Sequence, residues 1–210
     1  MEASLLFIFR PRRIRHGRTH KWPLLTFLET VMYRMIRKIA SIPKLVIPTS
    51  ELLEMDVEVL GEKLETSIQK IFKGSLAIRE VAAGSSNAEE QELTALTNAY
   101  YDVERFGIQF VASPRHADML MVTGPVSRNM AEGLRRTFEA TPAPKIVVAV
   151  GDGAIDGGVY RDSYAIHNSV EDVIPVDFKI PGDPPSPKVV LAALLQIFQE
   201  VESKEADSHE

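Results

Sequence analysis

The segment Val103–Arg136, VERFGIQFVASPRHADMLMVTGPVSRNMAEGLRR, is the stretch that decides the fold class. It contains two β-rich apolar runs, Ile108–Ala112 and Met119–Thr123. Runs that are nearly continuous in apolar residues are typical of strands covered on both faces, as in a parallel sheet. Ser127 then stands where it can cap a helix that continues through Thr137. The segment therefore predicts strands that alternate with helices.

The same alternation continues toward the C-terminus. Ile146–Val150 and Val173–Val176 predict two further strands. Ser186 followed by Pro187 is typical of a helix start, with the proline at the first helical position. The apolar face of that helix is formed by Val190, Leu191, Leu194, Leu195, Ile197, Phe198 and Val201. Together these elements predict an α/β domain over residues 75–202, with an open, mostly parallel sheet flanked by helices.

The N-terminal part of the chain has a different pattern. Residues 1–50 predict a basic, amphipathic extension, and residues 51–74 a helical segment that packs on the following domain or on a neighbouring subunit. Residues 203–210 form an acidic tail. The extension suits an anionic bilayer surface or a partner subunit, and the alternative is a pair of solvated, poorly ordered ends. Its basic residues are Arg10, Arg12, Arg13, Arg15, Arg18 and Lys21.

Composition excludes several classes of function. The formal net charge of −5 over 210 residues gives no case for nucleic-acid binding. No cysteine is present, which excludes disulfides, thiolate metal sites and a cysteine nucleophile. No apolar run is long enough to span a bilayer, and the N-terminal order of apolar and basic residues is not that of a secretory signal. We therefore expect an intracellular protein.

Four loops with unusual sequences fall at one edge of the predicted sheet. They are Thr123–Ser127, Gly151–Gly158, Pro181–Pro187 and the turn Ala83–Glu89. The first three follow predicted strands, and ligand sites of open α/β sheets lie at the carboxyl ends of the strands. We therefore expect any functional site at this edge.

These loops also carry a family resemblance. Val103–Arg136, KIVVAVGDGAIDGGVYRDSY (Lys145–Tyr164) and VIPVDFKIPGDPPSP (Val173–Pro187) resemble the small, N2-type cluster subunit of respiratory complex I. Membrane-bound, energy-converting NiFe hydrogenases and formate hydrogenlyases have a related subunit. The resemblance covers residues 75–201. It implies a flavodoxin-like core, one 4Fe–4S cluster on four cysteines and a position beside a large, quinone-binding or hydrogenase-like subunit.

This sequence departs from the family at every cluster ligand. Carried over position by position, the four cysteines fall on Ser86, Glu89, Gly153 and Asp183, and an additional cysteine seen in some relatives falls on Ile155. Cluster irons require thiolate donors, with histidine as an occasional substitute. We therefore expect no iron–sulfur cluster and no other cofactor.

Three hypotheses explain the replacements. In the first, Ser86 and Glu89 form a capping box that starts a helix. In the second, Glu89, Asp152, Asp156 and Asp183 converge and pair with a lysine or arginine of this chain or of a partner. In the third, the same oxygens hold Mg²⁺ or Ca²⁺, although their spacing matches no known metal loop.

The resemblance leads to a functional hypothesis. We expect a non-redox structural subunit, peripheral on the cytoplasmic face of the membrane, that bridges a large hydrogenase-like subunit and membrane-arm subunits. Arg115 and His116 are the expected partner contacts, and an ordinary surface loop is the alternative. The rival function is electron transfer through a cluster with non-standard or partner-supplied ligands. A stand-alone enzyme or cation-binding regulator that uses the acidic site is a further rival.

Overall fold

Five parallel strands make the central sheet of the computed structural model, which describes residues 45–206. The strands lie in the order β2-β1-β3-β5-β7, and every neighbouring pair is parallel. Counting only these five strands, this is the flavodoxin-like order, which confirms the predicted fold class. Their bounds are β1 Leu76–Ala82, β2 Ile108–Phe110, β3 Met119–Thr123, β5 Ile146–Val150 and β7 Phe178–Ile180.

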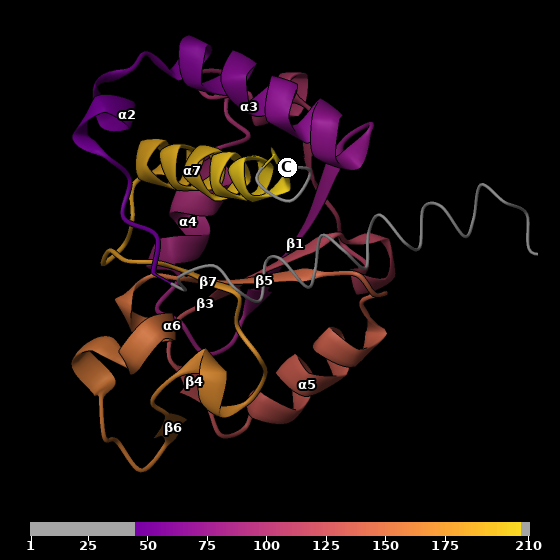
Figure 1. The fold of residues 1–210 in the computed structure, drawn as a ribbon. Helices are drawn as coiled ribbons and strands as arrows, with labels where there is room; N and C mark the ends of the chain where they lie inside the picture. Colours follow the sequence, from indigo (N-terminus) through magenta and orange to yellow (C-terminus); the bar gives the residue numbers. More distant parts are fainter. Residues whose placement is uncertain (1–44, 207–210) are drawn as a thin grey trace, which may run out of the picture.

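Helices cover both faces of the sheet (Figure 1). One face is covered by α3 Val57–Phe72 and α7 Pro187–Ala206, together with the shorter α2 Ser50–Glu54 and α4 Ala88–Ala95. The other face is covered by α5 Ala131–Ala140 and α6 Asp152–Asp156. A small antiparallel pair, β4 Val126–Ser127 and β6 Ile166–His167, lies beside α6. Four 3-10 helices complete the connections: Val103–Phe106, Pro114–His116, Gly158–Tyr160 and Val170–Asp172.

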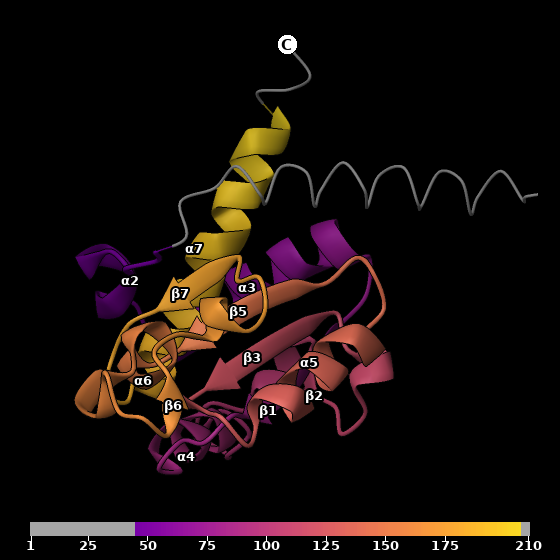
Figure 2. The same ribbon diagram turned by 90° about the horizontal axis from the view of Figure 1, so that it is seen from below.

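Two apolar clusters, one on each face of the sheet, form the core. In β3, Met119 and Met121 face α3 and α7, whereas Leu120 and Val122 face α5. All four side chains are fully buried, so the strand needs apolar residues at successive positions, as the sequence pattern indicated. The carboxyl end of β3 points to the side on which α6 and β6 lie (Figure 2).

One predicted strand does not form, and one predicted helix begins later than expected. The run Val173–Val176 forms no strand; it follows the 3-10 helix Val170–Asp172 and packs Ile174 and Val176 beneath the sheet. The last strand is instead β7, three residues long. The helix predicted to start after Ser127 begins at Ala131, because Ser127 first pairs in β4.

The described chain begins beside the last strand. Leu45 forms a parallel bridge with Lys179 of β7, and the Val46 amide donates to the Lys179 carbonyl at 2.9 Å. Helix α3 then packs along α7 and against the 3-10 helix that carries Phe106. The predicted basic amphipathic extension lies almost entirely outside the described residues, as does the tail beyond residue 206. Within residues 45–206, no helix is both long and apolar enough to cross a membrane.

Candidate functional site

The loops that follow β1, β3, β5 and β7 meet at the carboxyl edge of the sheet, as the sequence predicted. The Asp152 amide donates to the Gly182 carbonyl at 2.8 Å, and the Gly182 amide donates to Asp152 Oδ1 at 2.9 Å. The loops after β1 and β3 pack more closely still. A Cβ on Gly124, whose φ is +70°, would lie 2.2 Å from the Cα of Ser85, so only glycine fits this crossing.

The first ligand position does not cap the following helix. Helix α4 begins at Ala88 behind Asn87, which adopts a left-handed φ of 74° and makes no side-chain cap bond. The Ser86 side chain is exposed on the preceding turn. The capping-box hypothesis is therefore wrong, because the crossing of Ser85 and Gly124 fixes the turn in another conformation.

The second ligand position, Glu89, is buried in the first turn of α4. Only 4% of its surface is exposed. Its side chain lies against the start of the β5–α6 loop, since a Cβ on Gly151 would approach Glu89 Oε1 to 2.8 Å. Glu89 Oε2 is buried and has no hydrogen-bond partner among the described residues. A carboxylate in this position has lost its water without gaining a donor on that oxygen.

A neighbouring carboxyl group, Glu90, was not predicted as part of the site. The hydroxyls of Ser85 and Thr123 both donate to Glu90 Oε1. Glu90 Oε2 is buried without a partner. On β1, burial raises the pKa of Glu80, and the nearby Glu90 carboxylate raises it further. The sequence signal was the pair of glutamates in one helical turn, but their burial depends on where α4 begins.

The third and fourth ligand positions lie on the opposite loops. Gly153 is buried in α6, and a Cβ there would lie 3.0 Å from Pro125 Cδ, so this position has little room for a larger side chain. Asp183 is exposed on the loop after β7. Asp156, the other predicted acidic residue, pairs with Arg161 at 3.2 Å and accepts from the Gly158 amide.

Two of the predicted carboxyl groups, Asp152 and Asp183, lie close enough to a third, Glu89, to act on it electrostatically. Burial raises the pKa of Glu89 above its ordinary value, and the nearby carboxylates of Glu90, Asp183 and Asp152 raise it further, against a backbone hydrogen bond that lowers it. We call Glu89, Asp152 and Asp183 the acidic site. No group of three His, Cys, Asp or Glu side chains within residues 45–206 is arranged to hold a metal ion, so the hard-cation hypothesis gains no support.

The four ligand positions do not fit an iron–sulfur cluster. They offer an exposed hydroxyl, a buried carboxyl group, a glycine packed against proline and an exposed carboxyl group. None is a thiolate or an imidazole, the donors that cluster irons require. No redox step is therefore assigned to this edge of the chain.

A pocket of about 480 Å³ opens beside the acidic site. Asp152 and Asp183 line it together with apolar side chains from the β5–α6 region and from the start of the described chain. Two of these, Leu45 and Val159, are 53% and 84% exposed, and the nearby Tyr160 is 56% exposed. Large exposed apolar side chains around a charged pocket are typical of a protein-contact surface. The lining residues are Leu45, Asp152, Ile155, Asp156, Gly158, Val159, Pro181 and Asp183.

The predicted partner contacts lie at the other edge of the sheet. Arg115 and His116 are exposed in the 3-10 helix that precedes β3, at the amino ends of the strands. Nearby, Asp118 Oδ2 accepts from the Ala77 amide at 3.0 Å, so this carboxylate secures β1 to β3. The fold does not bring Arg115 and His116 together with the acidic site, and their role as partner contacts stays a prediction.

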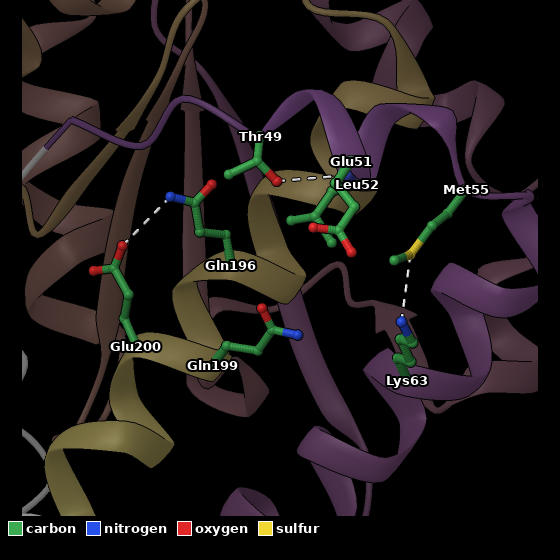
Figure 3. A pocket seen from close by; sticks show the side chains of 8 residues that line it. All are labelled: Thr49, Glu51, Leu52, Met55, Lys63, Gln196, Gln199 and Glu200. Atoms are coloured by element: carbon green, nitrogen blue, oxygen red, sulfur yellow. Dashed lines mark hydrogen bonds between the residues drawn. The ribbon is translucent and has the colours of Figure 1, made fainter.

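A second pocket, of about 470 Å³, lies between α2, α3 and α7 (Figure 3). Gln196, Gln199 and Glu200 of α7 face Thr49 and the α2 turn across it. Lys63 of α3 approaches the sulfur of Met55 at 3.4 Å. These residues belong to the helical layer, and none comes from the loops at the carboxyl edge.

Comparison with known proteins gives one matching family model and several similar chains. The model is described as NADH ubiquinone oxidoreductase, 20 Kd subunit, and it matches residues 87–197. The probable membrane-bound hydrogenase subunit mbhJ of Pyrococcus furiosus is 37% identical over 140 residues, which cover 67% of this chain and 84% of that protein.

Two further similarities extend this result. Formate hydrogenlyase subunit 7 of Escherichia coli K12 is 35% identical over 150 residues, which cover 71% of this chain and 59% of that protein. Among solved structures, a chain of the membrane-bound sulfane sulfur reductase, an archaeal respiratory membrane complex, is 34% identical with a TM-score of 0.56. That match covers 69% of this chain and 78% of the other.

Proposed function

This chain belongs to the family of the NADH ubiquinone oxidoreductase 20 Kd subunit, and we propose that it is a structural, non-redox member of it. In this proposal it bridges a large hydrogenase-like or quinone-binding subunit and the membrane arm of a complex related to complex I or to energy-converting hydrogenase. It would be peripheral, on the cytoplasmic face of the membrane. The similar proteins from Pyrococcus and the archaeal reductase are named as parts of membrane-bound complexes, which supports this assignment.

One observation carries the proposal: the chain keeps the family fold while every cluster-ligand position lacks a thiolate or imidazole. The core lies in the two apolar clusters on the faces of the sheet, whereas the ligand positions lie in loops at its edge. The fold therefore does not depend on the cluster ligands, and a subunit can retain its place in a complex without its cofactor.

The exposed apolar side chains around the acidic site favour a bridging role over a free protein. Leu45 and Val159, which line the pocket beside it, are 53% and 84% exposed. In a bridging subunit such side chains are covered by neighbours, and their burial contributes to association at about 25 cal/mol per Å² of apolar surface before the costs of binding.

The test is purification of the assembled complex through an affinity tag on this chain, from membranes of its own host. Quantitative mass spectrometry is expected to find the chain at one copy per large subunit. Low-temperature EPR and iron analysis of the purified full-length chain, after anaerobic incubation with iron and sulfide, are expected to show no cubane. A chain found free and monomeric would overturn the bridging role, and about four irons per chain with a cluster EPR signal would overturn the non-redox role.

A further inference from the structure

The acidic site holds more negative charge than its own surroundings compensate. Glu89 is 96% buried, since only 4% of its surface is exposed, and its Oε2 has no hydrogen-bond partner. Across residues 45–206, no lysine or arginine forms an ion pair with Glu89 or Asp183. At this edge Arg161 pairs instead with Asp156, in an exposed ion pair of 3.2 Å. A buried carboxylate that has no counter-ion and no donor to one of its oxygens is among the costlier arrangements in a folded protein.

The surroundings of the site indicate what kind of group would complete it. The pocket beside it is lined both by largely exposed apolar side chains, Leu45 and Val159 among them, and by the carboxyl groups of Asp152 and Asp183. A free metal ion would make no use of the apolar lining, and no metal-binding group of side chains is formed there among the described residues. A cationic side chain carried on an apolar protein surface matches both features.

We propose that the pocket receives a basic side chain of the partner subunit, which pairs with Asp183 and Asp152 in its lining and offsets the charge of the buried Glu89 carboxyl group behind them. An arginine suits it best, because a guanidinium is planar, weakly hydrated and able to bridge two carboxyl groups at once. The inference rests on the proposed bridging function. It adds that an ion pair between subunits has taken the position at which relatives of this family carry a cluster.

The experiment uses the tagged full-length chain in its membrane complex. Glu89→Gln and Asp183→Asn remove the two charges while keeping the shapes of the side chains. Glu132→Gln, on the exposed surface of α5, is the matched control. The readout is the dissociation constant of the subunit from the purified complex, measured over a range of salt concentrations. The variants are expected to bind roughly tenfold to thousandfold more weakly than wild type, with a shallower salt dependence. The control is expected to bind like wild type.

A direct view of the contact completes the test. In a cryo-EM map of the wild-type complex, density of a partner arginine or lysine is expected in the pocket, against Asp183 and Asp152. Reversal of that partner charge to glutamate is expected to weaken binding, and Asp183→Lys in this chain to restore part of it. A normal, stoichiometric complex with unchanged affinity in the Glu89→Gln/Asp183→Asn variant would overturn the ion pair and leave the bridging function intact. A wild-type chain with no partner would overturn both.

Discussion

Glu89 lies against Gly151, so closely that a Cβ on Gly151 would come within 2.8 Å of Glu89 Oε1. The contact joins the first turn of α4 to the loop after β5 across the carboxyl edge of the sheet. Gly151 also has a φ of +89°, which L side chains rarely adopt. Helix, loop and buried carboxyl group therefore depend on one another at this point.

Gly151→Ala is expected to destabilise the purified chain for two reasons, the positive φ and the contact with Glu89. The backbone strain alone costs about 1–3 kcal/mol. In a Glu89→Ala background the contact is gone, so Gly151→Ala is expected to cost less there. Urea unfolding of the four proteins measures the difference. Gly133→Ala, in the exposed part of α5, is the control. An added Cβ there would meet only Met130 Cε, at 4.0 Å, so the change is expected to be neutral or stabilising by up to about 1 kcal/mol. Equal costs in both backgrounds would show that Glu89 does not rest on Gly151.

Glu89→Gln is expected to stabilise the isolated chain at neutral pH, the opposite of its expected effect on the complex. The unfolded chain releases the Glu89 proton near the ordinary glutamate pKa, whereas burial keeps the proton bound to higher pH in the folded chain. Between these two pKa values the folded state binds more protons, so stability falls as pH rises through that window. Glutamine does not titrate and avoids this loss.

Thermal unfolding from about pH 4 to about pH 8 tests whether the stability of the wild-type chain falls relative to Glu89→Gln as the pH rises. The Tm advantage of Glu89→Gln is expected to be largest at the high end and to shrink toward the low end. Glu132→Gln, which removes only an exposed pair with Arg136, is expected to change stability by less than about 0.5 kcal/mol. A Glu89→Gln chain that is less stable than wild type at every pH would contradict the buried, uncompensated carboxylate.

Thr123→Val and Ser85→Ala each remove one of the two hydroxyls that donate to Glu90 Oε1. Because Glu90 is buried, each change is expected to cost about 1–3 kcal/mol of unfolding free energy. Ser86→Ala is the neighbouring control: its hydroxyl is exposed, and its loss is expected to stay within about 0.5 kcal/mol. Chemical denaturation measures the unfolding free energy of each variant. A loss for Ser86→Ala as large as that for Thr123→Val would refute the role of the two hydroxyls as donors to Glu90.

Gly61→Ala tests how α3 is attached to the α/β domain. A Cβ at this position would meet the Phe106 ring at 2.2 Å, so the ring or the helix must move. Overpacking of this kind costs about 1–3 kcal/mol. Phe106→Leu is expected to relieve part of that cost when combined with Gly61→Ala. The unfolding free energies of the two single variants and the double variant give the coupling, and purely additive effects would mean that α3 does not pack there.

The strands at the centre of the sheet were predictable because a short run of consecutive apolar residues is enough to identify them. Met119–Thr123 and Ile146–Val150 are buried on both faces, so an unbroken apolar run suffices to identify them. Strand β1 was not predicted, because Arg79 and Glu80 interrupt its apolar pattern. The opposite error occurred at Val173–Val176, where the apolar run predicted a strand that does not form. Its side chains are partly buried beneath the sheet, but the segment includes Pro175 and pairs with no strand.

The site was predictable in position but not in detail. Parallel strands bring their following loops to one edge, and the sequence alone placed Glu89, Asp152 and Asp183 there. The capping box failed because the conformation of the turn before α4 is set by Gly124, which is almost forty residues further along the chain. The burial of Glu90 depends on the same contact. Non-local contacts of this kind leave no periodic signal in a single sequence.

The loops at the carboxyl edge are held to each other by the reciprocal Asp152–Gly182 hydrogen bonds and by the Ser85–Gly124 crossing, all of which form within one chain. In the proposed non-redox function, maturation of this subunit needs no delivery of iron or sulfide, and molecular oxygen finds no thiolate in the chain to attack. Its biogenesis reduces to folding and docking.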